Sequence, residues 1–143
     1  MNAASFVSKL AAIVPLEDES HIESLQALVG QSVDLLLDPS VPGVVFSYME
    51  SHQAAYFGSP GPLVHFLERS YPSYIDALIS SVGRLPLSTT VWMVNRVLNS
   101  NPGPALSSRL LKSLREAAFH SSATQQVRIE ALEFLELHAP SEG

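Results

Sequence analysis

Apolar residues recur at every third or fourth position along most of this 143-residue chain, and breaks rich in proline and glycine interrupt them. This spacing places apolar side chains on one face of an α-helix, whereas a half-buried strand needs strict alternation. Runs of β-branched residues, such as Val44 and Val45, are too short for a strand and lie inside the helical pattern. The sequence therefore predicts an all-α protein of about eight short helices.

Proline, glycine and polar caps mark where these helices begin and end. The pattern predicts helices over residues 3–14, 20–36, 44–57, 61–69, 72–83, 89–99, 105–119 and 124–138. Capping boxes are predicted at residues 20–23 and 122–125, and Ser88 is predicted as an N-cap. From residue 44 onward the helices pair through short turns, at a spacing typical of helical-hairpin repeats. We therefore expect one domain over residues 1–143, built as an irregular HEAT-like stack, with a compact orthogonal helix bundle as the alternative.

Composition limits the chemistry that is available to the chain. Apolar residues make up 46% of the sequence and charged residues 15%, which is enough apolar surface for a core without covalent staples. The absence of cysteine excludes disulfides, thiolate metal sites and cysteine nucleophiles. The first residues do not resemble a signal peptide, and no apolar run approaches the ~20 residues of a membrane span. We expect a soluble, cytoplasmic protein without a cofactor.

Acidic residues are concentrated in the N-terminal half of the chain. Residues 10–68 contain eight Asp or Glu and no Lys or Arg, so this segment carries a charge of −8. The rest of the chain has eight basic and six acidic residues and a net charge of +2. A field of negative sign repels nucleic acid and attracts basic partners. The simpler interpretation is a solvated acidic surface that keeps the protein soluble.

This acidic segment is the predicted partner-binding region. Tyrosine beside carboxylates suits an interface, because the ring buries a large area at low entropy cost while the acids steer and pair with Arg or Lys. Four tyrosines are interleaved with positions that look exposed: Tyr48, Tyr56, Tyr71 and Tyr74. The predicted partner-binding residues are Glu17, Asp18, Glu19, Glu23, Asp34, Asp38, Tyr48, Glu50 and Tyr56.

Polar residues inside the most apolar helix suggest a structural clamp. Asn95 and Asn99 share one face of their predicted helix, and Arg96 lies between them. A buried arginine needs a carboxylate partner, because an unpaired buried charge costs several kcal/mol. Glu68 or Asp76 is predicted to pair with Arg96 across the helix pairs. A role of these polar residues in binding is the alternative to a purely structural one.

His65 and Glu68 stand three residues apart on one predicted helix, a spacing that can place two metal ligands together. Two ligands from one helix do not make a site, and His52 has no acidic residue three or four positions away. We therefore predict that His65 is hydrogen-bonded at the edge of the core and that the protein has no metal site.

No motif of a known catalytic mechanism occurs in the chain. It lacks the Gly-x-Ser-x-Gly nucleophile elbow. Residues 58–61 lack the Lys-Ser/Thr ending of a phosphate-binding loop, and Pro60 removes one N–H donor that such a loop supplies. The basic residues are scattered and not interleaved with aromatic residues, so no nucleic-acid interface is predicted. We expect a protein that is not an enzyme and has neither a nucleic-acid nor a membrane partner.

Part of the sequence resembles the small helical immunity proteins of bacterial polymorphic-toxin and contact-dependent growth inhibition systems. The resemblance is carried by residues 56–68, 74–78 and 86–96 and by Asn99, in a stretch of about a third of the chain. Its glycine, proline, tryptophan and Asn-Arg positions look like scaffold positions. The resemblance implies a cytoplasmic antidote that binds one toxin domain tightly, blocks its active site or its contact with substrate, and is not an enzyme.

Three functional hypotheses remain. The first is an immunity protein whose acidic N-terminal half covers a toxin domain; many toxin domains are basic nucleases, so a basic nuclease is the expected partner. The second is a non-catalytic helical-repeat scaffold or adaptor that binds a protein or peptide in its groove. The third is an enzyme that uses His65 and Glu68, with or without a metal ion.

Overall fold

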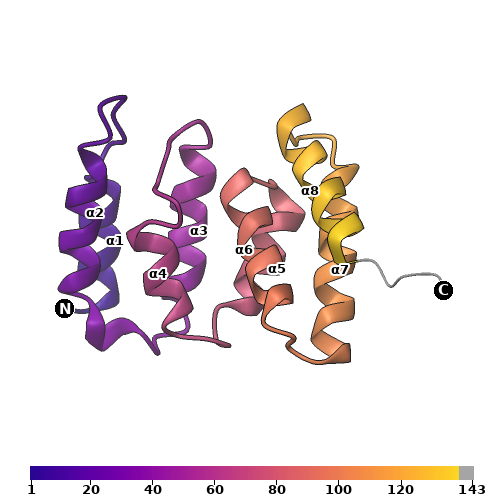
Figure 1. The fold of residues 1–143 in the computed structure, drawn as a ribbon. Coiled ribbons are helices and arrows are strands. Elements are labelled where there is room, and N and C mark those ends of the chain that lie inside the picture. Colours follow the sequence, from indigo (N-terminus) through magenta and orange to yellow (C-terminus); the bar gives the residue numbers. More distant parts are fainter. Residues whose placement is uncertain (139–143) are drawn as a thin grey trace. The chain divides into compact units, whose positions relative to one another are not determined.

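The computed structural model describes residues 1–138, which form eight α-helices and no strand. In chain order the helices are α1 (Ala3–Ala11), α2 (His21–Gly30), α3 (Val41–Ser51), α4 (Pro62–Glu68), α5 (Ile75–Arg84), α6 (Ser88–Asn99), α7 (Pro104–Ala118) and α8 (Gln125–His138) (Figure 1). One turn of 3-10 helix, η1 (Val33–Leu35), lies between α2 and α3. The predicted all-α class with about eight helices is therefore confirmed.

The chain divides into two compact units. Unit 1 is Met1–Ala77, and unit 2 is Leu78–Gly143, described here as far as residue 138. The boundary falls inside α5, and each unit has its own group of fully buried apolar side chains. The prediction of one domain over residues 1–143 stays a prediction.

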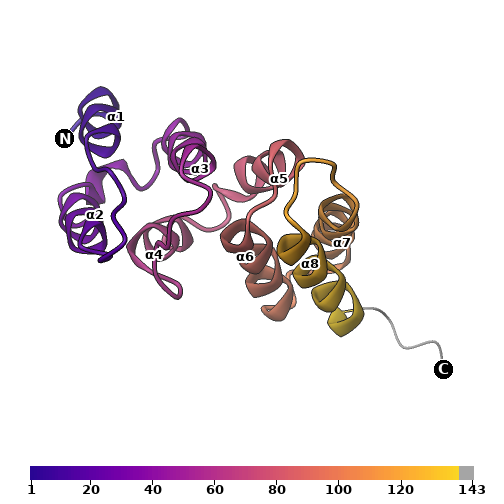
Figure 2. The same ribbon diagram turned by 90° about the horizontal axis from the view of Figure 1, so that it is seen from above.

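The helices of unit 1 lie in two layers. α1 packs against α2 and α3, and α2 packs against α4. Figure 2 shows α1 and α3 in one layer and α2 and α4 in the other. The rings of Phe6 in α1 and Phe66 in α4 stack with their centroids 6.0 Å apart, and both are buried. Unit 1 is therefore a pair of stacked helical hairpins closed over a shared apolar core.

Unit 2 is built around α6, which packs against both α7 and α8. α7 and α8 form a closely packed hairpin (Figure 1). Ala117 of α7 and Ala131 of α8 have no exposed surface, and small buried side chains let helices approach each other closely. Leu110 and Leu114, one turn apart on α7, are fully buried and supply the larger core side chains.

The predicted helix over residues 20–36 is wrong at its C-terminal end. α2 ends at Gly30, and the Ser32 hydroxyl donates to the carbonyl oxygen of Leu28 (2.6 Å), which ends the regular helix. The predicted capping box at residues 20–23 is also wrong. Ser20 already has helical backbone angles (φ −63°, ψ −23°), so its hydroxyl is not placed to cap, and it makes no capping bond.

Several other helix starts or ends differ from the sequence-based expectation. α1 ends at Ala11 and not at residue 14, and α5 begins at Ile75 and not at residue 72. α3 ends at Ser51, so His52 and Tyr56 do not continue its face. α6 begins at Ser88 itself, after its N-cap Leu87, whose N–H donates to the Thr90 hydroxyl oxygen (3.1 Å). The start of α8 is capped by Thr124 and not by Ser122 as predicted: the Thr124 hydroxyl oxygen accepts from the N–H of Val127 (3.2 Å). Within the described residues, no helix is both long and apolar enough to cross a membrane.

Candidate partner-binding groove

An open groove of about 590 Å³ lies in unit 1 between two loops. One wall is the loop between α1 and α2, and the other is the segment that follows α3. Its lining residues are Pro15, Leu16, Glu17, Glu19, Ser51, His52, Gln53, Ala54, Ala55 and Tyr56. The groove combines carboxylates with apolar surface, because Leu16 is 55% and Tyr56 46% exposed.

His21, the first residue of α2, holds the two walls together. Its side chain is only 3% exposed. The N–H of Leu16 donates to Nδ1 (3.0 Å), and Nε2 lies 2.6 Å from the carbonyl oxygen of Tyr56. Because a carbonyl only accepts, Nε2 carries the hydrogen, which fixes the neutral tautomer with Nδ1 as acceptor. One imidazole ring thus sets the distance between the walls of the groove.

A cluster of aromatic rings that includes the groove residue His52 stiffens the same two loops. The Tyr48 hydroxyl donates to the carbonyl oxygen of Ile13 (2.6 Å), which connects α3 to the loop that follows α1. The Tyr48 ring lies against His52 and Phe57, with centroid distances of 4.8 Å and 5.8 Å. Phe57 in turn meets the His21 ring edge to face at 6.2 Å. These contacts preorganise the groove before any partner arrives.

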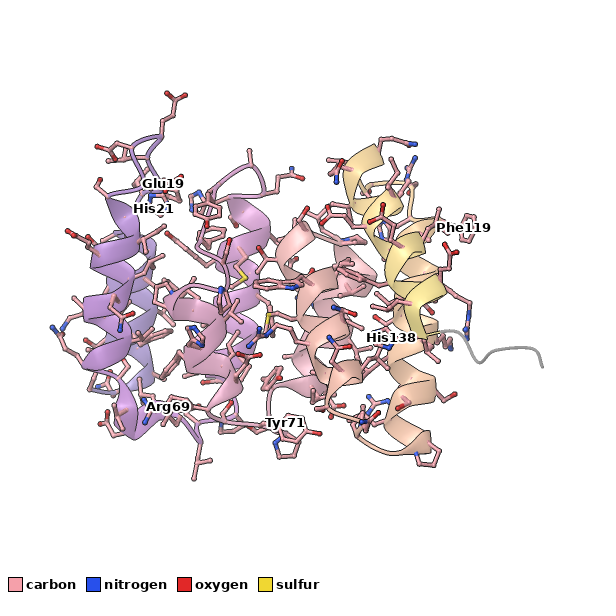
Figure 3. All side chains as sticks on the ribbon, in the orientation of Figure 1. Glu19, His21, Arg69, Tyr71, Phe119 and His138 are labelled. Carbon is pink, nitrogen blue, oxygen red and sulfur yellow. The ribbon has the colours of Figure 1, made fainter. Side chains whose placement is uncertain are left out.

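Exposed carboxylates gather at the groove end of unit 1. Glu17 and Glu19 line the groove, and Glu23 stands exposed in the first turn of α2, where the helix dipole favours a negative charge. In the described part of the chain no basic group forms an ion pair with any of the three. Unit 1 contains two basic side chains: Lys9, in the last turn of α1, and Arg69, which lies at the opposite end from Glu19 in Figure 3.

The carboxylate of Asp18 has a structural role, unlike those of its neighbours Glu17 and Glu19. Its Oδ1 accepts from the N–H of Ser20 (3.0 Å), which fixes the tight turn into α2. Hydrogen bonding to the backbone and the side chain of Ser20 lowers the pKa of Asp18. Glu19, inside this turn, has φ of +64°, in the left-handed region that side chains other than glycine rarely adopt. Asp18 is therefore a turn-forming residue.

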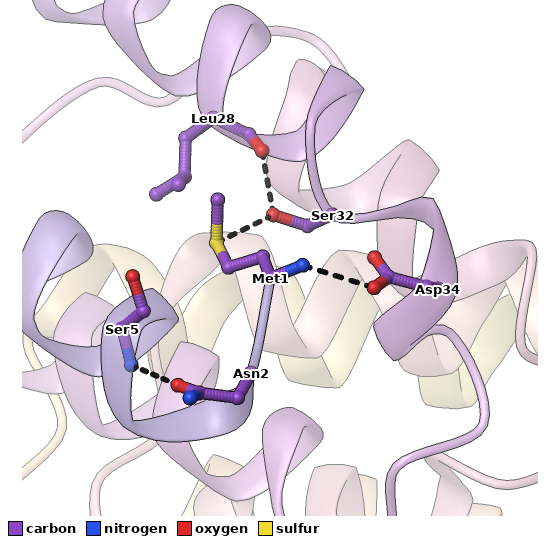
Figure 4. Close-up of polar contacts among 6 residues, drawn as sticks. All are labelled: Met1, Asn2, Ser5, Leu28, Ser32 and Asp34. Carbon is purple, nitrogen blue, oxygen red and sulfur yellow. Dashed lines mark hydrogen bonds and ion pairs between the residues drawn. The ribbon is translucent and has the colours of Figure 1, made fainter.

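Asp34 and Asp38 lie at the other end of unit 1, because the ten residues of α2 place ~15 Å between its first and last residues. Asp34 pairs with the amino group of Met1 (3.0 Å), as Figure 4 shows, and this hydrogen bond lowers the pKa of Asp34. Oδ1 of Asp38 accepts from the N–H and the hydroxyl of Ser40, which lowers the pKa of Asp38. The nine predicted partner-binding residues therefore do not form one patch.

We expect the stability of unit 1 to fall in acid through these three aspartates. All three pKa values are lowered by folding, so their contribution is complete above the unfolded-state pKa of about 4 and is lost as pH falls through the lowered values. The melting temperature, measured from about pH 6 down to about pH 2, should drop less in the variant D18N/D34N/D38N than in the native chain. An equal drop in both proteins would contradict this assignment.

Tyr48, another predicted partner-binding residue, does not lie at the exposed position that was expected. It is 7% exposed and is a buried structural residue, and burial raises the pKa of its hydroxyl. Tyr74, expected at an exposed position, is 2% exposed because it packs into the core. Tyr56 and Tyr71 are exposed as expected, and Tyr56 lines the groove. Glu50 is half-buried near the end of α3.

The residues of the predicted polar clamp lie in different environments and do not form one buried cluster. Asn95 is buried, and its Oδ1 lies 2.6 Å from Nε2 of His138, so it joins α6 to α8. Arg96 is half-buried and lies over the Trp92 ring, 5.3 Å from its centroid. Asn99 is exposed and does not share the environment of Asn95. The pairing of Arg96 with Glu68 or Asp76 stays a prediction.

The residues at the predicted metal-ligand spacing form only a weak pair. Nδ1 of His65 lies 3.8 Å from a carboxylate oxygen of Glu68, and the His65 side chain is 62% exposed. Within residues 1–138 no group of three or more His, Asp or Glu side chains is placed to hold a metal ion. His65 is thus a surface residue and not the core-edge histidine that the sequence predicts.

His21 is the important residue that sequence reasoning missed. The sequence places it inside a predicted capping box, and no local pattern points to its role. Its two partners, Leu16 and Tyr56, lie five and thirty-five residues away. A single histidine between Ser20 and Ile22 at a predicted helix start was the available signal, and it is not specific.

Comparisons of this chain with protein-family models, with curated proteins and with solved structures find no match.

Proposed function

We propose that this chain is an immunity protein that binds a cognate toxin domain and blocks its active or substrate-binding surface, without catalysing a reaction itself. The observation that carries the proposal is the preorganised groove with Glu17 and Glu19 on one wall and exposed apolar surface beside them. A rigid, partly apolar site with unpaired charge suits a tight protein complex, because little order has to be created on binding.

The charge of unit 1 supports a basic partner. Residues 1–77 contain nine acidic and two basic residues, whereas residues 78–143 contain five acidic and six basic residues. An acidic surface speeds association with a basic protein and disfavours nucleic acid. Nucleases need a positive surface to hold phosphates, so a basic nuclease domain is the toxin class that this charge fits best.

The resemblance to immunity proteins supports the same location. The stretch that carries it begins at Tyr56, which lines the groove, and continues through Gly58 and Gly61, both of which have positive φ angles. These glycines let the chain turn back from the groove into α4. The recognisable scaffold residues thus support one wall of the candidate site.

A non-catalytic scaffold or adaptor is the second candidate function, and the stacked hairpins of unit 1 favour it. The two functions differ in their response to salt. Binding through the carboxylates of the groove weakens as salt screens the charges, whereas binding of an apolar peptide between helices does not.

The proposal predicts that a toxin domain is encoded beside this chain, and that domain is the partner used in the test. We expect the two proteins to form a stable complex in size-exclusion chromatography and the toxin to lose its activity. The charge-reversal variant E17K/E19K/E23K should bind about 100-fold more weakly, because like charges facing each other at an interface cost several kcal/mol. Asp18 is left unchanged because it forms the turn.

The control variant is E133K/E136K, which reverses two exposed charges on α8 in unit 2. It should bind within about threefold of the native chain, as expected for charges outside an interface. A toxin that stays active and forms no complex with the native chain would refute the immunity function. A complex that is equally weakened by both variants would refute the acidic groove as its site.

A further inference from the structure

We propose that the groove between the α1–α2 loop and the segment after α3 receives an arginine side chain of the partner protein. Glu17 and Glu19 bind the guanidinium group, and Leu16 and Tyr56 cover the aliphatic stem. This inference rests on the proposed function only for the identity of the partner, because the groove and its chemistry belong to the chain itself.

The size and openness of the groove point to a side chain presented by a protein. Its volume of about 590 Å³ holds a long side chain together with some of the backbone that carries it. The walls are two loops held at a fixed distance by His21, so the space exists before binding. A site that is open and already formed suits a projecting side chain from a rigid surface.

The lining of the groove matches the two parts of an arginine. Leu16 is 55% and Tyr56 46% exposed, and both lie on its walls. Contact between this exposed apolar surface and the methylene stem of a long cationic side chain is favourable, because both are removed from water. In the described chain the carboxylates of Glu17 and Glu19 have no cation of their own, so they are available for an incoming one.

Arginine fits this lining better than lysine does. Its planar guanidinium is weakly hydrated, binds two carboxylate oxygens at once and stacks on aromatic rings, whereas the lysine ammonium is a strongly hydrated point charge. The groove offers both features, since Tyr56 and His52 supply rings and two glutamates supply oxygens. Arginine is also one of the residues that dominate binding energy at protein interfaces.

The test uses a short peptide probe, acetyl-Gly-Arg-Gly-amide, and the same peptide with citrulline in place of arginine. Citrulline has nearly the same shape but no charge. The full chain labelled with ¹⁵N is titrated with each peptide, and amide chemical shifts are followed. We expect the arginine peptide to shift the amides of residues 15–19 and 51–56, with at least about fivefold weaker binding of the citrulline peptide.

Two variants of equal charge locate the site. The variant E17Q/E19Q should bind the arginine peptide about five- to tenfold more weakly, while E133Q/E136Q should bind it as the native chain does. Both pairs of residues are exposed, so neither change is expected to affect folding. The spread of amide shifts in the free proteins verifies this.

Several outcomes would overturn the inference: equal binding of the citrulline peptide, shifts spread evenly over all acidic surfaces, or equal weakening by the two variants. The inference and the proposed function can fail separately. If the toxin is neutralised but the peptide does not bind the groove, the arginine site is wrong and the immunity function stands. If the peptide binds as expected but the toxin stays active, the immunity function is wrong and the arginine site stands.

Discussion

Replacing Gly61 with alanine is expected to destabilise unit 1 by about 3 kcal/mol or more. Gly61 has φ of +85°, in the left-handed region where an L side chain is strained. A Cβ atom at this position would collide with the carbonyl oxygen of Phe57 and approach Gly58 Cα to 2.9 Å. These are backbone atoms, so the loop itself has to move. The midpoint of urea denaturation measures the effect.

Gly43→Ala is the matched control for this substitution. Gly43 lies inside α3, and a Cβ atom there would meet nothing within 4 Å. Gly43 is the third residue of α3, where alanine should stabilise the protein by up to about 0.5–1 kcal/mol. The two changes are chemically identical and should act in opposite directions. Equal effects would show that the backbone of the loop before α4 is not strained in the way described.

Replacing His21 with phenylalanine is expected to destabilise unit 1 by about 2–3 kcal/mol. Phenylalanine keeps an aromatic ring of at least the same size at this position, so no cavity forms, but the Leu16 N–H and the Tyr56 carbonyl both lose their partner. Because these two hydrogen bonds join the walls of the groove, the loss should also appear as faster hydrogen exchange of the Leu16 amide.

His65→Phe is the control, because the His65 side chain is 62% exposed and its contact with Glu68 is long. We expect this variant to lie within about 0.5 kcal/mol of the native protein and to leave the Leu16 amide unchanged. An unaltered urea midpoint for His21→Phe, or an unaltered exchange rate at Leu16, would mean that the imidazole does not hold the two loops.

The all-α class could be predicted because it depends on local spacing. Positions such as Leu110 and Leu114, one helical turn apart, reveal a helical face whatever surrounds them. Helix ends were harder to predict. The stripe of apolar residues continues past Gly30, but the Ser32 hydroxyl bond to Leu28 ends α2, and a hydroxyl in a turn leaves no trace in the apolar pattern.

The candidate site could be predicted only in part, since it combines segments that are distant in sequence. The charge count identified the acidic region that contains Glu17 and Glu19, and it did so without any structure. It could not show that Asp34 lies at the other end of unit 1, nor that Tyr48 is buried with its hydroxyl on the Ile13 carbonyl. Such contacts depend on how helices stack, which local spacing does not encode.

The central claim is that a basic partner binds at the acidic groove of unit 1. The most direct test is the affinity of the toxin domain for the native chain and for two charge-matched variants, measured by titration calorimetry in one buffer. We predict that E17Q/E19Q binds about tenfold or more weakly and that E133Q/E136Q binds within about twofold of the native chain. Equal affinities of the three proteins for the toxin would contradict the claim.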